Sequence, residues 1–494
     1  MPDTTRRIAK SISWLYSFRW LERLLDFAAI VILARFLLQE DFGLIAVASS
    51  LVLIIDGLSD FNVELALIRT RETSRELFDT AWTLSCIRGL LSATVMLGVA
   101  AVLTDPRVVE LLQVLAVVPI LKGLANPRFV MFERDLDYSR LAIQTLLAKV
   151  VSVVVTIAVA AIYQSYWAVI VGMLVNTSVM TGLSYLLKPS LPRFSLKCFK
   201  DIFSFTGWMT LSSIVSTLYM HTDKLIVGRF LGMADAGLYF MTQRVGTLPT
   251  RELISPLRQV LFPSFSEMAA DRQRLRLAVG EAFSVAGSLA MPAAFGFALI
   301  ANDFVPLLLG DRWVGTVPLL VVLVPLLGMR ATFSVVQPCM LALGETRLLF
   351  FAGVIYGVVH IAAFTLGTIY FGLPGAVWGI VAAGVVFVFL NYALLQRLLG
   401  IGFAEILSHA LRPFVSALVM VGAVFLLDAM IALPLFSSAG AWSALWIKTI
   451  VGAGVYVITQ YGLWRLQGRP PGVEDRLIRL LISGKPSVAS ESRR

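Results

Sequence analysis

Long apolar stretches, each about the length of a membrane-spanning helix, follow one another along almost the whole chain. A helix needs about 20 mostly apolar residues to cross the hydrocarbon core of a bilayer. Windows of this kind lie near residues 14–38, 42–64, 80–103, 111–131, 141–163, 167–187, 203–222, 236–262, 278–302, 316–342, 348–371, 375–398, 413–432 and 441–465. The pattern predicts an all-α polytopic membrane protein with about 14 transmembrane helices.

The composition agrees with lipid as the solvent of this chain. Of its 494 residues, 58% are hydrophobic and only 15% are charged, whereas soluble globular proteins carry about 25% charged residues. Cys86, Cys198 and Cys339 are odd in number and widely separated, so no disulfide framework is expected. These features exclude an ordinary soluble domain.

Basic residues gather in alternate turns between the windows, as the positive-inside rule requires. With a cytoplasmic N-terminus, the basic residues on the cytoplasmic side are Arg69, Arg71, Arg75, Arg128, Arg134, Arg140, Lys188, Arg193, Lys197, Lys200, Arg272, Arg274, Arg276, Arg347, Arg397 and Arg412. Those on the opposite side are Arg35, Arg107, Lys224, Arg229 and Arg312. The asymmetry predicts that both termini are cytoplasmic. The positive-inside rule therefore accounts for the net charge of +10, and binding of nucleic acid is not needed to explain it.

A ten-residue segment occurs twice. Arg35–Leu44 recurs as Arg229–Leu238 at an offset of 194, and Arg, Phe, Leu, Asp, Gly and Leu match in place. Each copy connects one window to the next on the outer side, where Asp and Gly are typical turn residues because Gly allows positive φ. Six windows separate the copies, an even number, so the sequence predicts a parallel repeat like those of secondary transporters.

The repeat predicts the domain organisation. We expect an N-terminal six-helix lobe over residues 1–187 and a C-terminal six-helix lobe over 202–398. A cytoplasmic linker, 188–201, joins them. Two additional transmembrane helices, 399–465, and a basic cytoplasmic tail, 466–494, lie outside the repeat.

Several windows contain ionisable residues, which at membrane depth usually face a cavity or a partner. In the first window, Arg19, Glu22, Arg23 and Asp26 share one helical face. They either neutralise one another or line a cavity. In the second window, Asp56 and Asp60 are spaced by four; they either pair with the arginines of the first window or bind a coupled proton or sodium ion.

The eighth window carries a series of arginines at heptad spacing. Arg244, Arg251 and Arg258 form one stripe that drifts only about 20° per heptad, and at 1.5 Å per residue the stripe extends over roughly 21 Å. Pro249 and Pro256 are expected to kink this helix. The stripe is either a set of interhelical salt bridges or a cationic path for an anionic headgroup, since a guanidinium group matches phosphate in bidentate geometry.

Motifs for catalysis are missing from the sequence. His221, His360 and His409 are solitary, and neither HExxH nor GxxxxGK[ST] occurs. We therefore expect no metal site and no ATP hydrolysis by this chain. A membrane glycosyltransferase or polymerase typically has a sizeable outer loop with acidic or metal-binding groups, and the turns here are short. A transporter needs no such loop.

Several motifs resemble one known family. The stretches LARFLLQEDFGL, DGLSDFNVELALI, FERDLDY, TDKLIVGRFLGMADAGLY and LLLGDRWVGTVPLL are similar to the polysaccharide-transport (Wzx-like) branch of the multidrug/oligosaccharidyl-lipid/polysaccharide flippases. The resemblance covers roughly residues 10–430. One departure is Gln39, where many relatives have proline in the turn.

The resemblance implies a flippase and not an enzyme. It implies two six-helix lobes around a central cavity and alternating access between the two sides of a bacterial inner membrane. The implied substrate is an undecaprenyl-pyrophosphate-linked oligosaccharide, moved to the periplasmic leaflet for lipopolysaccharide, O-antigen or exopolysaccharide synthesis. Implied partners are membrane lipids and enzymes of the same pathway, a polysaccharide polymerase and glycosyltransferases.

In that setting, each charged stripe has an expected role. Arg19, Arg23, Arg244, Arg251 and Arg258 would hold the pyrophosphate, and Asp26, Asp56 or Asp60 would bind a coupled ion. No other cofactor is expected. The alternative within the same superfamily is a drug or cation exporter, which would be expected to offer carboxylates to its substrates, whereas the charge at depth here is mainly positive.

Overall fold

The structure, a computed structural model, describes residues 2–59, 67, 74–135, 137–199, 207–431 and 440–468. All secondary structure assigned in these ranges is helical, and each of the predicted apolar windows coincides with helical residues. Nine helices in these ranges are long and apolar enough to cross a membrane. The predicted all-α polytopic fold is therefore confirmed, while the full number of spans stays a prediction.

Two compact units divide the chain, Met1–Phe240 and Met241–Arg494, which we call the first and the second unit. The boundary falls within α12. The first unit contains helices α1 (Pro2–Phe36), α2 (Gln39–Leu58), α4 (Arg75–Val102), α5 (Pro106–Leu115), α6 (Val117–Gly123), α7 (Val130–Arg134), α8 (Tyr138–Tyr163), α9 (Trp167–Leu187) and α11 (Gly207–Phe230), and the start of α12 (Met233–Gly246). A 3₁₀ turn, η1 (Pro127–Phe129), precedes α7. The predicted division into two six-helix lobes stays a prediction.

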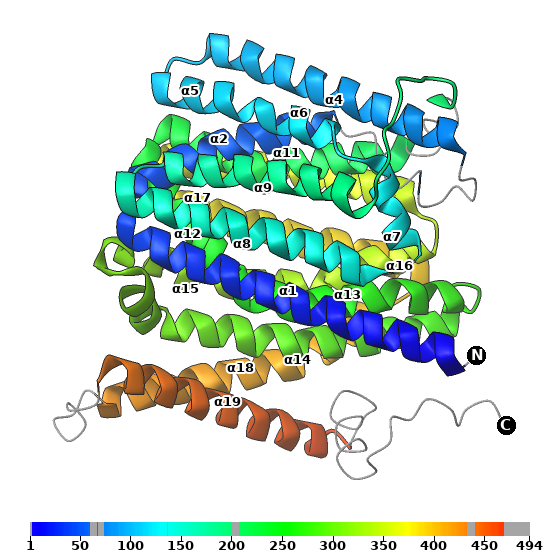
Figure 1. Cartoon of the computed structure of the whole chain (residues 1–494). Coiled ribbons are helices and arrows are strands. Elements are labelled where there is room, and N and C mark those ends of the chain that lie inside the picture. Colours follow the sequence, from blue (N-terminus) through cyan, green and yellow to red (C-terminus); the bar gives the residue numbers. More distant parts are fainter. Residues whose placement is uncertain are drawn as a thin grey trace. The chain divides into compact units, whose positions relative to one another are not determined.

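Within the first unit, α8 packs against α9 and α1 lies along α8, as Figure 1 shows. α4 packs on α6, and α11 packs on α2. The window 111–131 is divided into short helices around Ala116. Pro119 accounts for the division, because it lacks the N–H group that would bond to the carbonyl of Leu115.

The second unit contains the remaining long helices. These are α13 (Leu248–Met268), α14 (Arg272–Phe304), α15 (Val317–Thr332), α16 (Val336–Ala342), α17 (Thr346–Leu399), α18 (Phe403–Ile431) and α19 (Ala441–Leu466). α14 packs against α15 and α18, and α19 lies along α18 (Figure 1). Asp271 caps α14, because its Oδ1 accepts hydrogen bonds from the backbone N–H groups of Gln273 and Arg274.

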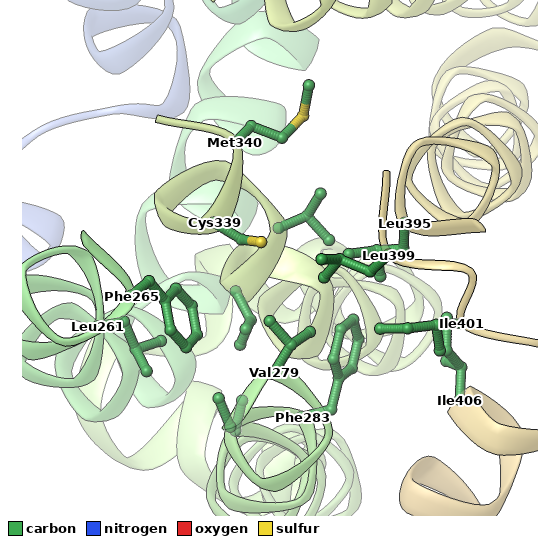
Figure 2. Close-up of a cluster of buried hydrophobic side chains, with 14 of the residues drawn as sticks. Leu261, Phe265, Val279, Phe283, Cys339, Met340, Leu395, Leu399, Ile401 and Ile406 are labelled. Atoms are coloured by element: carbon green, nitrogen blue, oxygen red, sulfur yellow. The ribbon is translucent and has the colours of Figure 1, made fainter. Parts of the chain in front are cut away.

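A cluster of buried apolar side chains holds several helices of the second unit together near their ends. Figure 2 shows Leu261 and Phe265 near Val279 and Phe283, with Cys339 beside them. These side chains come from α13, α14 and α16, and further members come from α17 and α18. The turns between α13 and α14, between α16 and α17, and between α17 and α18 lie beside this cluster. The cluster therefore holds these helices together at the end of the second unit that the basic residues predict to be cytoplasmic.

The two copies of the repeat occupy equivalent positions in the fold. α1 ends at Phe36 and α2 begins at Gln39, while α11 ends at Phe230 and α12 begins at Met233. Both boundaries differ by the repeat offset, 230 − 36 and 233 − 39 each giving 194. The predicted repeat is thus confirmed at the level of the connecting turns.

Candidate functional site

The charged face of α1 carries the first group of predicted site residues. Arg19, Arg23 and Asp26 are all half-buried on this helix. Asp26 forms an ion pair with α8, since Nζ of Lys149 lies 2.5 Å from its Oδ1. Asp26 is therefore not a free carboxylate, and one of its partners comes from outside the α1 stripe.

The carboxylate of Asp56 lies between two cations of the first unit. Nζ of Lys122 on α6 is 2.8 Å from Oδ2 of Asp56, and a terminal guanidinium nitrogen of Arg88 on α4 is 3.7 Å from Oδ1. For Asp56, the alternative of pairing with the arginines of the first window is therefore wrong, because the packing of α4 and α6 beside α2 provides these cations instead. Asp60 lies outside the described residues.

The arginine series of the eighth window lies on two helices and not on one. Arg244 is in the last turn of α12, and Arg251 and Arg258 are in α13, with Thr247 between the helices. The interruption is local, because Thr247 keeps helical dihedral angles (φ −82°, ψ −18°), its N–H donates to the carbonyl of Gln243, and its carbonyl accepts from the N–H of Arg251. The expected kink near Pro249 is therefore confirmed. Pro249 accounts for it, since proline suits the first turn of a new helix but cannot donate to the carbonyl of Val245.

All three arginines of this series are exposed side chains. Arg258 donates from Nη2 to Oε1 of Gln337 on α16, and Arg244 is also engaged by a partner. In the part of the chain that the structure describes, the guanidinium group of Arg251 makes no hydrogen bond, ion pair or ring contact. The five N–H donors of Arg251 are therefore available to a ligand.

Other cations at membrane depth are committed to protein partners. The guanidinium group of Arg330 lies 5.2 Å from the ring centre of Tyr356 and 5.1 Å from that of Phe387. The two rings contact each other edge to face, with their centres 5.3 Å apart, and both stabilise the cation by cation–π attraction. Arg330 is thereby a structural residue, in contrast to Arg251.

Two groups of ion-paired side chains were not predicted from the sequence. In the first unit, Asp223 accepts a hydrogen bond from Tyr239 at 2.7 Å and pairs with Lys224 at 2.9 Å. The adjacent Asp and Lys in the stretch TDKLIV indicate an ion pair in the sequence. The sequence does not indicate Tyr239, which reaches Asp223 only because α12 packs against α11. Both Asp223 and Lys224 are buried, so they link α11 to α12.

The second group joins three helices of the second unit. Lys448 of α19 is 8% exposed, and its Nζ lies 2.5 Å from Oδ2 of Asp303 and 2.6 Å from Oδ1 of Asp428. Asp303 belongs to α14 and Asp428 to α18. The sequence indicates Lys448 and Asp428 as charges at depth, but Asp303 follows the end of its apolar window and gives no such signal.

The exposed arginines give the site the chemistry of anion binding. Among the described residues, no three His, Cys, Asp or Glu side chains come together in a way that would hold a metal ion. Exposed guanidinium groups bind phosphate or carboxylate through paired, charge-assisted hydrogen bonds. The stripe of Arg244, Arg251 and Arg258 is thus the part of the second unit best suited to an anionic ligand.

Comparison with known proteins gives consistent matches. A family model described as polysaccharide biosynthesis protein matches residues 32–318. The lipopolysaccharide biosynthesis protein WzxC of Escherichia coli (strain K12) is 25% identical over 400 residues, which cover 79% of this chain and 81% of WzxC. The succinoglycan biosynthesis transport protein ExoT of Rhizobium meliloti (strain 1021) is 25% identical over 403 residues, covering 80% and 81% of the two chains.

Solved structures share the fold. The structure of the lipid II flippase MurJ in an inward closed conformation superposes with a TM-score of 0.74 at 14% sequence identity. The superposition covers 92% of this chain and 99% of MurJ. At this identity the likeness describes the architecture of the helices and does not identify a substrate.

Proposed function

The chain belongs to the polysaccharide biosynthesis protein family, and from that premise we propose that it is a flippase for an undecaprenyl-pyrophosphate-linked oligosaccharide. The substrate would move from the cytoplasmic to the periplasmic leaflet of a bacterial inner membrane, by alternating access. There it would serve the synthesis of lipopolysaccharide or exopolysaccharide. The single observation that carries the proposal is the exposed guanidinium group of Arg251, which has no partner among the described residues and lies within the arginine series of α12 and α13.

The eighth window is predicted to span the membrane, and an arginine in a spanning segment needs a compensating environment. Placing arginine at the centre of a spanning helix costs about 2.5–3.5 kcal/mol on insertion scales. Arg251 has no partner among the described residues that would offset this cost. A water-filled path that receives a diphosphate would do so, because the diphosphate offers several acceptor oxygens to a planar fork of donors.

The relatives support the class of substrate. WzxC is named for lipopolysaccharide biosynthesis, ExoT for transport in succinoglycan biosynthesis, and MurJ for flipping of lipid II. We propose by extension that the headgroup of the lipid carrier binds to the arginine series, while Arg19 and Arg23 of the first unit contact the substrate at another stage. Polymerase and glycosyltransferase partners would make and consume the substrate.

A coupled ion would have to compete with a lysine. Asp26 is held by Lys149 and Asp56 by Lys122, so a proton or sodium ion binds at either carboxylate only when the lysine moves away or shares the site. We propose Asp26 and Asp56 as coupling sites in this competitive form. The same role for Asp60 stays a prediction from the sequence.

Leaflet-resolved measurement of lipid-linked oligosaccharide tests the proposal. Cells lacking the protein should accumulate the lipid-linked sugar in the cytoplasmic leaflet, and the wild type should clear it. We expect Arg251→Gln to reduce clearance at least about tenfold, the effect of losing one charge-assisted contact of 1.5–3 kcal/mol. Arg251→Lys, which keeps the charge and loses the fork, should give an intermediate rate.

The control variant is Arg397→Gln. Arg397 is also exposed and lies in the last turn of α17, outside the arginine series, so its loss should leave clearance unchanged. Expression of all variants has to be matched. If deletion of the protein leaves lipid-linked sugars unchanged in both leaflets, the flippase proposal is wrong, and export of a cationic drug becomes the function to test.

A further inference from the structure

A second cationic site lies in the first unit, away from the arginine series of α12 and α13. It is a cavity of about 180 Å³ formed by the start of α4, the η1 turn and the linker after α9. Its lining includes Arg75, Arg128, Asp79, Pro127, Pro189 and Pro192. The count of basic residues predicts that this end of the helices faces the cytoplasm.

Hydrogen bonds between the linker and α4 fix one side of the cavity. The backbone N–H groups of Arg193 and Ser195 donate to Oδ1 of Asp79 and Oγ1 of Thr83, each at 3.0 Å. Further along, Nζ of Lys197 donates to Oε1 of Glu76 at 2.7 Å, and this bond raises the pKa of Lys197. The linker is therefore held along the first turns of α4.

The other side of the cavity is fixed by one buried amide. Nδ2 of Asn126 donates to the carbonyl oxygen of Lys188 at 2.6 Å, and its Oδ1 accepts from Oγ of Ser190 at 2.9 Å. Asn126 is 3% exposed. With three prolines in the walls as well, the cavity keeps its shape without a ligand, which lowers the entropy cost of binding.

The charge inside the cavity is positive. Asp79 is already committed to the N–H group of Arg193 and to Nε of Arg75 at 3.8 Å. The guanidinium group of Arg128 lies 5.6 Å from the ring centre of Phe78, and in the described part of the chain its side chain makes no hydrogen bond or ion pair. A half-buried guanidinium with unused donors is suited to an oxyanion such as a phosphate group.

Apolar side chains beside the cavity indicate where the phosphate comes from. Leu191, which also lines the cavity, is 83% exposed, and Phe194 is 77% exposed. A soluble phosphate compound has no apolar part that would contact these exposed side chains. A phospholipid does, because its acyl chains lie next to its headgroup at the membrane surface, and anionic lipids are attracted to basic residues there.

We propose that this cavity binds the phosphate of an anionic phospholipid headgroup, with Arg128 as the main ligand and Arg75 as the second. The bound lipid would contact α4, the η1 turn and the linker together. The site is independent of the proposed flippase function, since none of its residues belongs to the charged stripes of α1, α12 or α13.

Native mass spectrometry of the purified, delipidated full-length protein tests the site. Phosphatidylglycerol is titrated against phosphatidylethanolamine of the same acyl chains. We expect Arg128→Gln to weaken phosphatidylglycerol binding about tenfold and Arg75→Gln to weaken it less. Arg128→Lys should lose part of the affinity, because lysine keeps the charge but not the fork.

The matched control is Arg140→Gln, which removes the same charge from the same predicted cytoplasmic side of the protein. Arg140 does not line the cavity; its Nε lies 3.3 Å from Oδ2 of Asp137, and its guanidinium group lies over Phe132. We expect this variant to bind phosphatidylglycerol as the wild type does. Thermal unfolding of each variant checks the fold, and Arg128→Lys and Arg75→Gln keep the test valid if Arg128→Gln does not fold.

Three results would overturn the proposal. Equal losses in Arg128→Gln and Arg140→Gln would mean diffuse attraction to a basic surface. Equal binding of phosphatidylethanolamine and phosphatidylglycerol would mean that the anionic charge of the headgroup is not recognised. Displacement of the lipid by an equal concentration of inorganic phosphate would assign the cavity to a soluble anion.

Discussion

Gly43 and Gly237, which are equivalent in the two copies of the repeat, lie in mutual backbone contact within the first unit. A Cβ atom on Gly43 would come 1.8 Å from the carbonyl oxygen of Met233, and one on Gly237 would come 1.8 Å from that of Gln39. Gln39 and Met233 are themselves equivalent under the offset, since 233 − 39 is 194. The contact is therefore reciprocal, as expected for two copies related by a pseudo-two-fold axis.

This contact gives the repeat glycines a different role from the one expected. Gly43 lies inside α2 and Gly237 inside α12, and neither has a positive φ. The explanation of these glycines by turn chemistry is therefore wrong. They are needed because the first turns of α2 and α12 approach each other so closely that a side chain does not fit.

We predict that Gly237→Ala and Gly43→Ala each lower the free energy of unfolding by about 1–3 kcal/mol, the usual cost of overpacking. The added methyl group would have to displace a backbone carbonyl, which cannot rotate away as a side chain can. Thermal or denaturant unfolding of the purified protein in detergent measures the change. Gly98→Ala is the control, because a Cβ atom at Gly98 in α4 meets nothing within 4 Å.

Gly98→Ala should leave stability unchanged or raise it by about 0.5–1 kcal/mol through the helix propensity of alanine. If Gly237→Ala were as stable as Gly98→Ala, the first turns of α2 and α12 would not be in close contact in the folded protein.

A second glycine prediction concerns the long helix α17. Gly372 interrupts it with φ of 65° and ψ of −149°, a combination that is essentially limited to glycine. This residue lets the windows 348–371 and 375–398 form two successive segments. We predict that Gly372→Ala costs about 1–3 kcal/mol through backbone strain alone, since a Cβ atom there has open space.

Gly353→Ala in the same helix is the matched control, because its Cβ atom also has open space and its backbone is helical. Unfolding in detergent compares the two variants directly. Equal stability of both would mean that the chain adopts a different backbone conformation at Gly372.

The helical windows were predictable because lipid imposes a simple rule on sequence. Every spanning segment has to satisfy its backbone groups internally and present apolar side chains, so length and hydropathy predicted the helices. The resemblance to the polysaccharide-transport family and the role of a transporter are likewise confirmed by the family model and the relatives. Each of these features is encoded within one continuous segment of the sequence, so it can be predicted without knowing how the helices pack.

Which of the prolines interrupts the helix was not predictable from the sequence in the same way. Pro249 begins a new helix, whereas Pro256 and Pro263 lie inside α13. Proline is compatible with the first turn of a helix and with a kinked interior, and the packing of the neighbouring helices decides between the two. The sequence around each proline does not contain that information.

The partners of the buried charges show the same limit. The sequence places Asp56 in a spanning helix but does not reveal that α4 and α6 bring Arg88 and Lys122 to it. Asp303 joins Lys448 only because α14 and α19 pack together. Such contacts arise from tertiary packing between segments far apart in the sequence, and no spacing rule predicts them.

The ion pairs around Lys448 lead to a stability prediction. Lys448→Met would leave Asp303 and Asp428 close together without their shared cation. Breaking a fully buried pair costs about 3–5 kcal/mol, and because the side chain of Asp428 is 40% exposed we expect a value at or below the lower end of this range. We expect this loss of stability on unfolding in detergent, and partial recovery when Asp303→Asn is added to Lys448→Met.

The recovery distinguishes charge from shape. If Lys448→Met and the double variant were equally unstable, the loss would come from the packing of the lysine side chain and not from uncompensated carboxylates. Lys197→Met is the control for loss of a surface cation. It removes an exposed pair with Glu76 and should leave stability essentially unchanged, because exposed ion pairs are screened by solvent.

The pair between Lys122 and Asp56 allows a direct test of competitive ion coupling. Lys122→Met removes the nearer of the two cations at Asp56 and leaves Arg88 at 3.7 Å. Loss of a positive neighbour favours binding of another cation at the carboxylate. If Asp56 is the coupling site, the sodium or proton concentration that gives half-maximal transport in proteoliposomes should fall by about tenfold, the effect of removing roughly 1.4 kcal/mol of repulsion.

Lys197→Met, with the same change of charge outside the spanning helices, should leave that concentration unchanged. An ion dependence identical in Lys122→Met and the wild type would exclude Asp56 as the site and leave its two cations a purely structural role.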